Sequence, residues 1–279
     1  MSGTLYLVGT PIGNLSDFSP RGIAALEAAD FIAAEDTRVT LKLLNHFGIK
    51  KNLVSYFEHN KHQRGGEIIA RLQAGESCAL VSDAGMPCIS DPGEELVVLC
   101  AENGIPVAAV PGPSALVTAL AVSGLPTARF SFEGFLSVNR KNRRRHLEEI
   151  KNDARTLVFY EAPHKLPATL RDLYEALGDR RVSIVRELTK IHEEVVRTTL
   201  SEAASMPEDA KYRGELVLVV EGETASPEAP ASPDDALALA LSYLRAGESA
   251  AAASKRAAAQ TGLKKGDIYK LLIQAQRRQ

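Results

Sequence analysis

The chain has 279 residues, of which 45% are hydrophobic, and a formal net charge of -2. This length and apolar content are sufficient for two domains, each with its own core. No apolar run approaches the roughly 20 residues needed to cross a bilayer, and the first residues lack the pattern of a signal peptide. Cys78, Cys88 and Cys100 lack paired metal-ligand spacing, which predicts reduced thiols in a cytoplasmic protein without a metal site.

The first 125 residues alternate short apolar runs with amphipathic stretches. Five strands are expected at 5–8, 31–34, 53–56, 79–82 and 106–110. Five helices are expected at 21–29, 38–47, 63–74, 92–103 and 113–123. This alternation predicts an α/β fold with a mostly parallel sheet and helices on both faces. Ligands of such sheets bind beyond the carboxyl ends of the strands, so the loops at these ends are the candidate sites.

Three of those loops are rich in glycine and proline, at 9–14, 82–93 and 111–115. Glycine permits close backbone approach and proline adds rigidity, although ordinary turns use the same residues. Their occurrence after three strands of one sheet favours a shared pocket. The chain has neither G-x-G-x-x-G after the first strand nor a P-loop motif, and its prolines remove amide donors that a phosphate would require. A ligand with little phosphate is therefore expected.

A second α/β pattern follows the first, and its adjacent late strands predict a mixed sheet. Strands are expected at 130–132, 156–160, 182–185, 194–199 and 215–220, and helices at 143–151, 165–177 and 200–206. The stretch 222–233 is rich in proline, alanine and serine and is typical of a linker. Beyond it, helices at 250–261 and 267–274 predict a small helix-turn-helix unit. We therefore expect domains at 1–125, 126–221 and 234–279.

Six motifs carry a family resemblance, at 9–15, 34–38, 82–93, 111–115, 160–165 and 186–193. In order and spacing over residues 4–221 they closely resemble the ribosomal RNA small-subunit methyltransferase I family of the tetrapyrrole methylase superfamily. One departure is Met86, where threonine is expected in the family's loop. The resemblance implies a two-domain homodimer that uses S-adenosylmethionine. It also implies methylation of the ribose 2′-hydroxyl of cytidine 1402 in the decoding region of 16S ribosomal RNA.

S-adenosylmethionine carries a sulfonium and an amino acid end but no phosphate, so neutral Gly/Pro loops and a few carboxylates suit it. The resemblance implies that it lies in a cleft between the two domains, which is a common position for ligand pockets. The residues implied to surround it are Thr10, Pro11, Gly13, Asp83, Ala84, Gly85, Met86, Ser114, Ala115, Ala162, Gly214 and Glu215.

Methyl transfer from a sulfonium to a hydroxyl requires alignment of the two groups and removal of the hydroxyl proton. Carboxylates or a lysine near a cationic partner suit this task. We predict Asp36, Arg38, Glu187 and Lys190 as polar groups at the acceptor site. Two structural alternatives remain open: Asp36 caps the helix that starts near Arg38, and Glu187 with Lys190 forms an interdomain ion pair.

The run Arg140, Lys141, Arg143, Arg144 and Arg145 is predicted to act as a basic lid that binds the RNA backbone. Its structural alternative is a solvated helix face. The tail from residue 236 is also basic and is expected either to bind RNA or to cap the protein. Two other functions remain open at this stage. They are methylation of a tetrapyrrole such as a corrin precursor, and RNA binding without catalysis.

Overall fold

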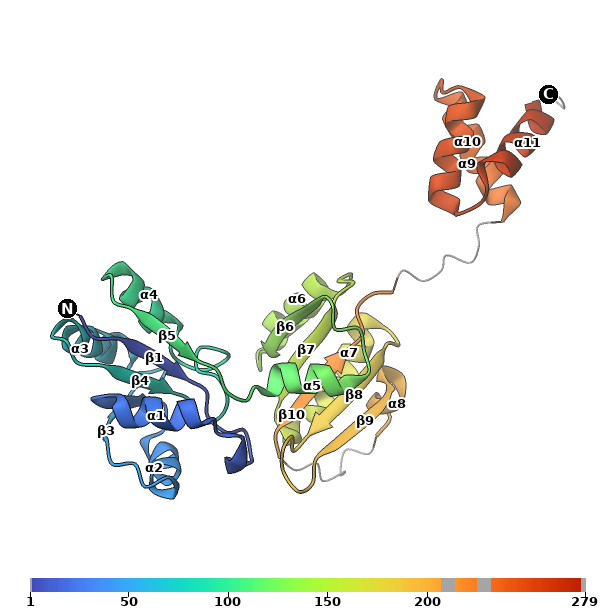
Figure 1. Cartoon of the computed structure of the whole chain (residues 1–279). Coiled ribbons are helices and arrows are strands. Elements are labelled where there is room, and N and C mark those ends of the chain that lie inside the picture. The colour runs from blue at the N-terminus through green and yellow to red at the C-terminus, as the bar shows by residue number, and fades with distance from the viewer. Residues whose placement is uncertain (1, 207–213, 225–231, 277–279) are drawn as a thin grey trace. The chain divides into compact units, whose positions relative to one another are not determined.

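A computed structural model describes residues 2–206, 214–224 and 232–276. Residues up to Glu223 contain two five-stranded sheets, and the residues from Thr224 onward form a separate helical unit. Figure 1 labels the helices and strands. The predicted fold class, a mostly parallel sheet followed by a mixed sheet and terminal helices, is confirmed.

The first sheet is entirely parallel and has the strand order β3-β2-β4-β1-β5. Its strands are β1 (Leu5–Val8), β2 (Phe31–Ala34), β3 (Asn52–Ser55), β4 (Cys78–Val81) and β5 (Val107–Val110). One face is covered by α1 (Pro20–Ala28) and α2 (Thr37–His46), and the other by α3 (Lys61–Gln73) and α4 (Glu94–Glu102). The central strands β2 and β4 are fully buried, as expected of a parallel sheet covered on both faces.

Local signals set the helix starts of this half. Ser19 caps α1 by accepting a hydrogen bond from the Gly22 amide, and Pro20 occupies the first helical position, where its missing amide is harmless. Helix α4 begins at Glu94 instead of residue 92, because Gly93 has a φ of 143°, outside the helical region. The expected start of α4 was therefore two residues too early.

Strands β1 and β4 lie side by side, and the helices that follow them pack on opposite faces of the sheet. Such a divergence opens a crevice beyond the carboxyl ends of the two strands.

Backbone contacts hold together the loops that border this crevice. Thr10 and Gly85 exchange two amide hydrogen bonds of 2.8 and 3.1 Å. Gly9 and Gly112 approach so closely that a Cβ on Gly112 would lie 2.6 Å from the Gly9 carbonyl oxygen.

The second sheet has the order β6-β7-β10-β8-β9, with β6 and β7 parallel and the other neighbours antiparallel. Its strands are β6 (Phe130–Phe135), β7 (Thr156–Glu161), β8 (Arg181–Arg186), β9 (Glu194–Thr199) and β10 (Leu216–Val220). Helices α6 (Arg140–Ile150), α7 (Leu166–Leu177) and α8 (Leu200–Ala204) pack on one face. Strand β6 extends beyond the expected residue 132 to Phe135, through a β-bulge between Phe132 and Gly134.

The other face of this sheet is covered by α5 (Ala115–Ser123), a helix that precedes the expected domain boundary at residue 125. Ala119 and Leu120 of α5 are buried in one cluster with Val217 of β10. Ile12, from the loop after β1, joins the same cluster. Segments from the first half of the chain therefore complete the core of the second sheet, and residues up to 223 form one compact unit.

The helical unit consists of α9 (Pro233–Arg245), α10 (Ala250–Thr261) and α11 (Lys265–Gln276). Its core is formed by small and aliphatic side chains, Ala236, Ala240, Ala253, Ala257, Ile268 and Leu272. The expected helix-turn-helix pair corresponds to α10 and α11, which Gly262 separates with a φ of 70°. Helix α9 was missed: Ser232 and Asp235 form a capping box at its start, inside the expected linker. In the described part of the chain, no helix has the length and apolar character to cross a membrane.

Candidate active site

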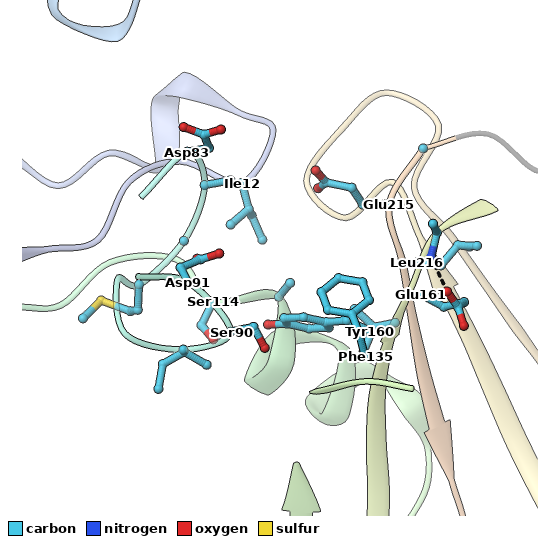
Figure 2. Close-up of a pocket in the computed structure, with 18 of the residues that line it drawn as sticks. Ile12, Asp83, Ser90, Asp91, Ser114, Phe135, Tyr160, Glu161, Glu215 and Leu216 are labelled. Atoms are coloured by element: carbon cyan, nitrogen blue, oxygen red, sulfur yellow. Dashed lines mark hydrogen bonds between the residues drawn. The ribbon is translucent and has the colours of Figure 1, made fainter. Parts of the chain in front are cut away.

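A cavity of about 640 Å³ lies at the crevice and is lined from both sheets (Figure 2). The loops after β2, β4 and β5 supply one wall, and β6, β7, β10 and the 187–190 turn supply the other. Nine of the expected cofactor residues and one expected acceptor-site residue line it: Asp83, Ala84, Gly85, Met86, Ser114, Ala115, Ala162, Gly214, Glu215 and Lys190.

The remaining cofactor residues support this cavity without lining it. Thr10 is buried, and its hydroxyl donates to the Ser82 carbonyl at 3.3 Å. Gly13 has Lys190 close to its backbone, since a Cβ there would lie 2.6 Å from Cγ of that lysine. Pro11 lies between Thr10 and Ile12, and Ile12 is the residue of this loop that reaches the cavity. Met86 lines the cavity, and its sulfur packs over Gly9, so the departure from threonine fills space beside the first loop.

Three carboxylates that follow strands of the first sheet lie at one end of the cavity: Glu35, Asp83 and Asp91. Figure 2 labels Asp83 and Asp91. Two of the three carboxylates, Glu35 and Asp83, are linked through the backbone, because the Asp36 amide donates to Oδ1 of Asp83 at 3.0 Å and the Asp83 amide donates to Oε2 of Glu35 at 3.4 Å. Burial raises the pKa of both Glu35 and Asp83 above their ordinary values. This end of the cavity therefore favours a cationic ligand.

Asp91 has the most perturbed carboxyl of the cavity. Burial, followed by repulsion from Glu35, raises its pKa to about 7, although a hydrogen bond with Ser82 opposes the shift. The repulsion of Asp83 and Glu215 adds to the same effect. A carboxyl with this pKa changes charge near neutral pH, which is typical of functional sites.

Asp36 and Arg38, which are predicted at the acceptor site, are bound to each other and are not among the residues that line the cavity. Asp36 caps α2 by accepting a hydrogen bond of 2.8 Å from the Arg38 amide. Its carboxylate also accepts two hydrogen bonds from the Arg38 guanidinium, and this pairing lowers the pKa of Asp36 to about 2. The helix-cap alternative therefore describes Asp36 as the structure shows it.

Glu187 and Lys190 do lie at the site. Nζ of Lys190 donates to Oε1 of Glu187 at 2.9 Å, and Lys190 lines the large cavity while Glu187 lines a small adjoining one. The turn between them is strained, because Glu187 and Thr189 have φ values of 52° and 65°. The carboxylate of Glu187 occupies the space that a Cβ of Gly214 would fill. Lys190 is the one basic residue among the described residues that line the cavity.

Several lining residues were missed by the sequence analysis. Ile12, Tyr160 and Glu161 belong to quoted motifs but carry no individual signal for a ligand, and Phe135 lies beyond the expected strand 130–132. Ser90 and its neighbour Ile89 also line the cavity, and Ser90 has a φ of 64°. The density of glycine, proline and aspartate in 82–93 was the available signal for that loop.

The basic run lies on α6, where its members differ in their contacts. Arg143 is turned toward α7: its side chain is 12% exposed, pairs with Asp172 at 2.5 Å and donates to Thr169 at 2.9 Å. Arg140, Lys141, Arg144 and Arg145 are exposed, and Arg145 has only a loose pair with Glu149 at 3.8 Å. Arg143 is thus a packing residue, and the other four cations face solvent.

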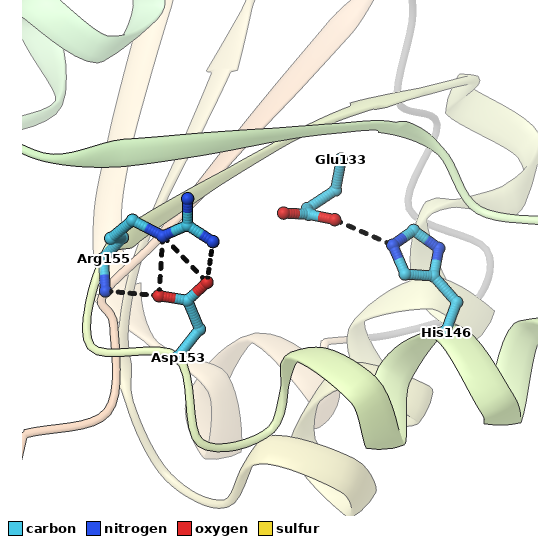
Figure 3. Close-up of polar contacts among 4 residues, drawn as sticks. All are labelled: Glu133, His146, Asp153 and Arg155. Carbon is cyan, nitrogen blue, oxygen red and sulfur yellow. Dashed lines mark hydrogen bonds and ion pairs between the residues drawn. The ribbon is translucent and has the colours of Figure 1, made fainter.

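Two further pairs anchor the strand and loop around this helix (Figure 3). His146 of α6 shares a hydrogen bond of 2.8 Å with Glu133 of β6. Asp153, just after α6, accepts hydrogen bonds from the backbone and the guanidinium of Arg155. In the part of the chain that the structure describes, no cluster of side chains has the composition of a metal site.

The chain is similar to proteins of known family. Residues 4–204 match the family model described as Tetrapyrrole (Corrin/Porphyrin) Methylases. The chain is 50% identical to "Ribosomal RNA small subunit methyltransferase I" of Halalkalibacterium halodurans, over 98% of this chain and 95% of that protein. It is 46% identical to the protein of the same name in Synechocystis sp., over 98% of both chains. The chain belongs to the ribosomal RNA small subunit methyltransferase I family.

Members of the wider superfamily share the architecture with little sequence identity. The crystal structure of uroporphyrin-III-C-methyltransferase from Thermus thermophilus superposes with a TM-score of 0.55 at 20% identity, covering 78% of this chain and 94% of that one. At that identity the likeness shows the fold alone. The sequence resemblance to methyltransferase I is therefore confirmed, and the tetrapyrrole methylase fold with it.

Proposed function

We propose that this protein is an S-adenosylmethionine-dependent methyltransferase that methylates the ribose 2′-hydroxyl of cytidine 1402 in 16S ribosomal RNA. The relatives of known name support methyl transfer to small-subunit ribosomal RNA, and the specific atom is inferred from the family resemblance. A homodimer that works in the cytoplasm forms part of the same proposal. The observation that carries it is the acid-lined cavity at the crevice of the first sheet.

The cavity suits S-adenosylmethionine in size and chemistry. Its volume of about 640 Å³ lies within the roughly 300–1,000 Å³ typical of small-molecule sites. Five carboxylates line it, and they complement the sulfonium and ammonium charges of the cofactor: Glu35, Asp83, Asp91, Glu161 and Glu215. Ile12, Tyr160 and Leu216 supply apolar surface for the adenosyl group. No P-loop or dinucleotide fingerprint occurs in the sequence, in keeping with a cofactor that lacks phosphate.

The bound cofactor would supply an electrophilic methyl group, and the protein must orient the hydroxyl and accept its proton. We assign the acidic end of the cavity, with Asp83 and Asp91, to the cationic groups of the cofactor. Lys190 is assigned to the acceptor end, where its ammonium stabilises negative charge as the hydroxyl loses its proton. Glu187 holds that ammonium in place through the 2.9 Å contact.

The solvent-facing cations of α6 are predicted to bind the RNA backbone. Replacing Lys141, Arg144 and Arg145 together by alanine should weaken binding of a decoding-region RNA by about tenfold or more at 0.1 M salt. It should also flatten the salt dependence, because fewer counterions are released. The measurement is fluorescence anisotropy at several salt concentrations.

Arg143→Ala serves as the matched control for this helix. Because Arg143 pairs with Asp172 and Thr169, its loss should lower the melting temperature and leave the salt slope almost unchanged. An unaltered salt slope in the triple variant would show that α6 is a solvated face without contact to RNA.

The function itself is tested by methyl transfer. Purified protein is incubated with labelled S-adenosylmethionine and one of three acceptors: small ribosomal subunits, protein-free 16S RNA, or a corrin precursor. We expect label in the RNA of the first sample or the first two, in a nucleotide that resists alkaline cleavage because its 2′-oxygen is methylated. Label in the corrin precursor would favour tetrapyrrole methylation, and cofactor binding without transfer to any acceptor would favour a non-catalytic RNA-binding protein.

A further inference from the structure

Phe135 is a large aromatic side chain that the fold places, largely exposed, at the cavity. It is the last residue of β6, it lines the cavity, and 58% of its surface is accessible. A β-bulge precedes Phe135 in the strand, since the register of β6 against β7 shifts between Phe132 and Gly134. Gly134 has a φ of 63°, a conformation that favours glycine. Bulges of this kind re-aim the side chains that follow them.

The ring of Phe135 packs against a second aromatic ring of the cavity wall. It contacts Tyr160 with ring centroids 5.6 Å apart and planes tilted by 63° (Figure 2). Tyr160 in turn contacts Phe132, with ring centroids 4.9 Å apart. The hydroxyl of Tyr160 accepts a hydrogen bond of 3.1 Å from the Leu116 amide, at the start of α5. Tyr160 is therefore tied to the core of the second sheet, while Phe135, which packs against it, remains 58% exposed.

The surroundings of Phe135 distinguish two possible aromatic partners, the adenine of the cofactor and a base of the RNA. Gly134 lies against the 82–93 loop, because a Cβ on Gly134 would be 3.6 Å from Oγ of Ser90. The chain then enters α6 within a few residues, and α6 carries the solvent-facing cations Lys141 and Arg144. The exposed ring therefore stands between an acidic cavity and a basic helix. This arrangement suits a nucleotide whose ribose enters the cavity while its phosphates stay outside, near the cations of α6.

We propose that Phe135 is a positioning residue on which the base of the acceptor nucleotide stacks, so that the adjoining ribose is presented to the methyl group. This inference rests on the proposed function. A nucleotide whose ribose enters a cavity is splayed away from its neighbours, and proteins stack such bases on aromatic side chains. Stacking of a base on one aromatic residue is sequence-tolerant and contributes about tenfold or more in affinity.

The test compares Phe135→Leu, which keeps an apolar side chain but removes the ring, with Phe135→Tyr, which keeps the ring. Val138→Ala, at an 82% exposed position in the same connection and outside the cavity lining, is the matched control. For each protein we measure kcat and KM for methyl transfer to small ribosomal subunits, and the Kd for S-adenosylmethionine by calorimetry. We expect Phe135→Leu to lower kcat/KM by about tenfold or more with little change in cofactor Kd, and Phe135→Tyr and Val138→Ala to resemble the wild type.

Two results would overturn the inference while the proposed function stands. One is a Phe135→Leu variant whose kcat/KM equals that of an active wild type. The other is a loss of cofactor affinity that matches the loss of kcat/KM, which would assign the ring to adenine. A wild-type protein that binds cofactor but transfers no methyl group to ribosomal RNA would instead overturn the proposed function, and this inference with it.

Discussion

Replacing Asp91 by asparagine is expected to weaken S-adenosylmethionine binding by about tenfold or more at pH 8 and to stabilise the cofactor-free protein. The first effect arises because asparagine removes a negative charge from the acidic end of the cavity. The second arises because the carboxylate is costly to ionise in the partly buried site beside Glu35 and Asp83, as its pKa of about 7 shows.

The pH dependence of stability has a definite sign. The folded protein holds the Asp91 proton up to about pH 7, whereas an unfolded chain releases it near the ordinary aspartate pKa of 3.8. The stability contributed by this proton is therefore present at low pH and is lost as pH rises from about 4 to about 7. After a discount for the part of the group that water reaches, Asp91→Asn should add about 1 kcal/mol at pH 8, or roughly 2–4 °C in melting temperature.

Affinity for the cofactor should rise with pH, whereas the stability contributed by the Asp91 proton falls. Because only the ionised carboxylate attracts the cation, wild-type affinity should rise as pH increases through about 7. Binding below that pH should release a proton, which calorimetry in buffers of different ionisation enthalpy detects. Asp91→Asn should bind with a flatter pH profile, and Asp17→Asn, at an exposed position in a short 3-10 helix (Leu15–Asp17), should match the wild type. A steep wild-type profile that persists in Asp91→Asn would assign the titration to another group.

Replacing Lys190 by methionine is expected to lower kcat for methyl transfer by about hundredfold, with little change in cofactor Kd. Methionine keeps much of the chain that packs over Gly13 but removes the ammonium that Glu187 holds at the cavity. Loss of one positioned electrostatic donor typically costs about 10²–10³ in kcat. Glu187→Gln should be milder, since an amide oxygen still accepts the hydrogen bond from Nζ.

Single-turnover methyl transfer at saturating RNA separates this effect from binding. Lys42→Met, at an exposed position on α2, provides the matched control and should retain full activity. If Lys190→Met instead weakens cofactor binding with unchanged single-turnover rate, the lysine contacts the carboxylate of the cofactor and its assignment to the acceptor end is wrong.

Much of the fold could be predicted from the sequence because most strands of the first sheet are short apolar runs between clear turn signals. Segments 5–8 and 31–34 match β1 and β2 residue for residue. The packing partner of α5 could not be predicted, since a helix that is apolar all round gives no indication of which sheet it covers. Helix α9 could have been found from Ser232 and Asp235, whose spacing fits a capping box, but the proline-rich composition before it masked the signal.

The candidate site was predictable where a loop carried several constrained residues and less so elsewhere. Asp83 and Gly85 belong to such a loop and line the cavity. Asp36 follows a strand in the same way, yet its side chain turns back to cap α2, and composition cannot distinguish these two orientations. The place of Phe135 depends on a bulge in β6, and the alternation of a strand pattern does not reveal where one residue is inserted.

The packing of α5 also has a consequence for how the chain is made. During synthesis α5 leaves the ribosome with the first sheet, but its partners Val185 and Val217 are translated much later. The apolar side chains of α5 therefore stay exposed to solvent, or are bound by chaperones, until β8 and β10 have been synthesised. The first sheet can assemble early, whereas the cavity exists only after almost the whole unit has been translated. A truncated product would therefore lack the site and would expose the apolar side chains of α5, which promote aggregation.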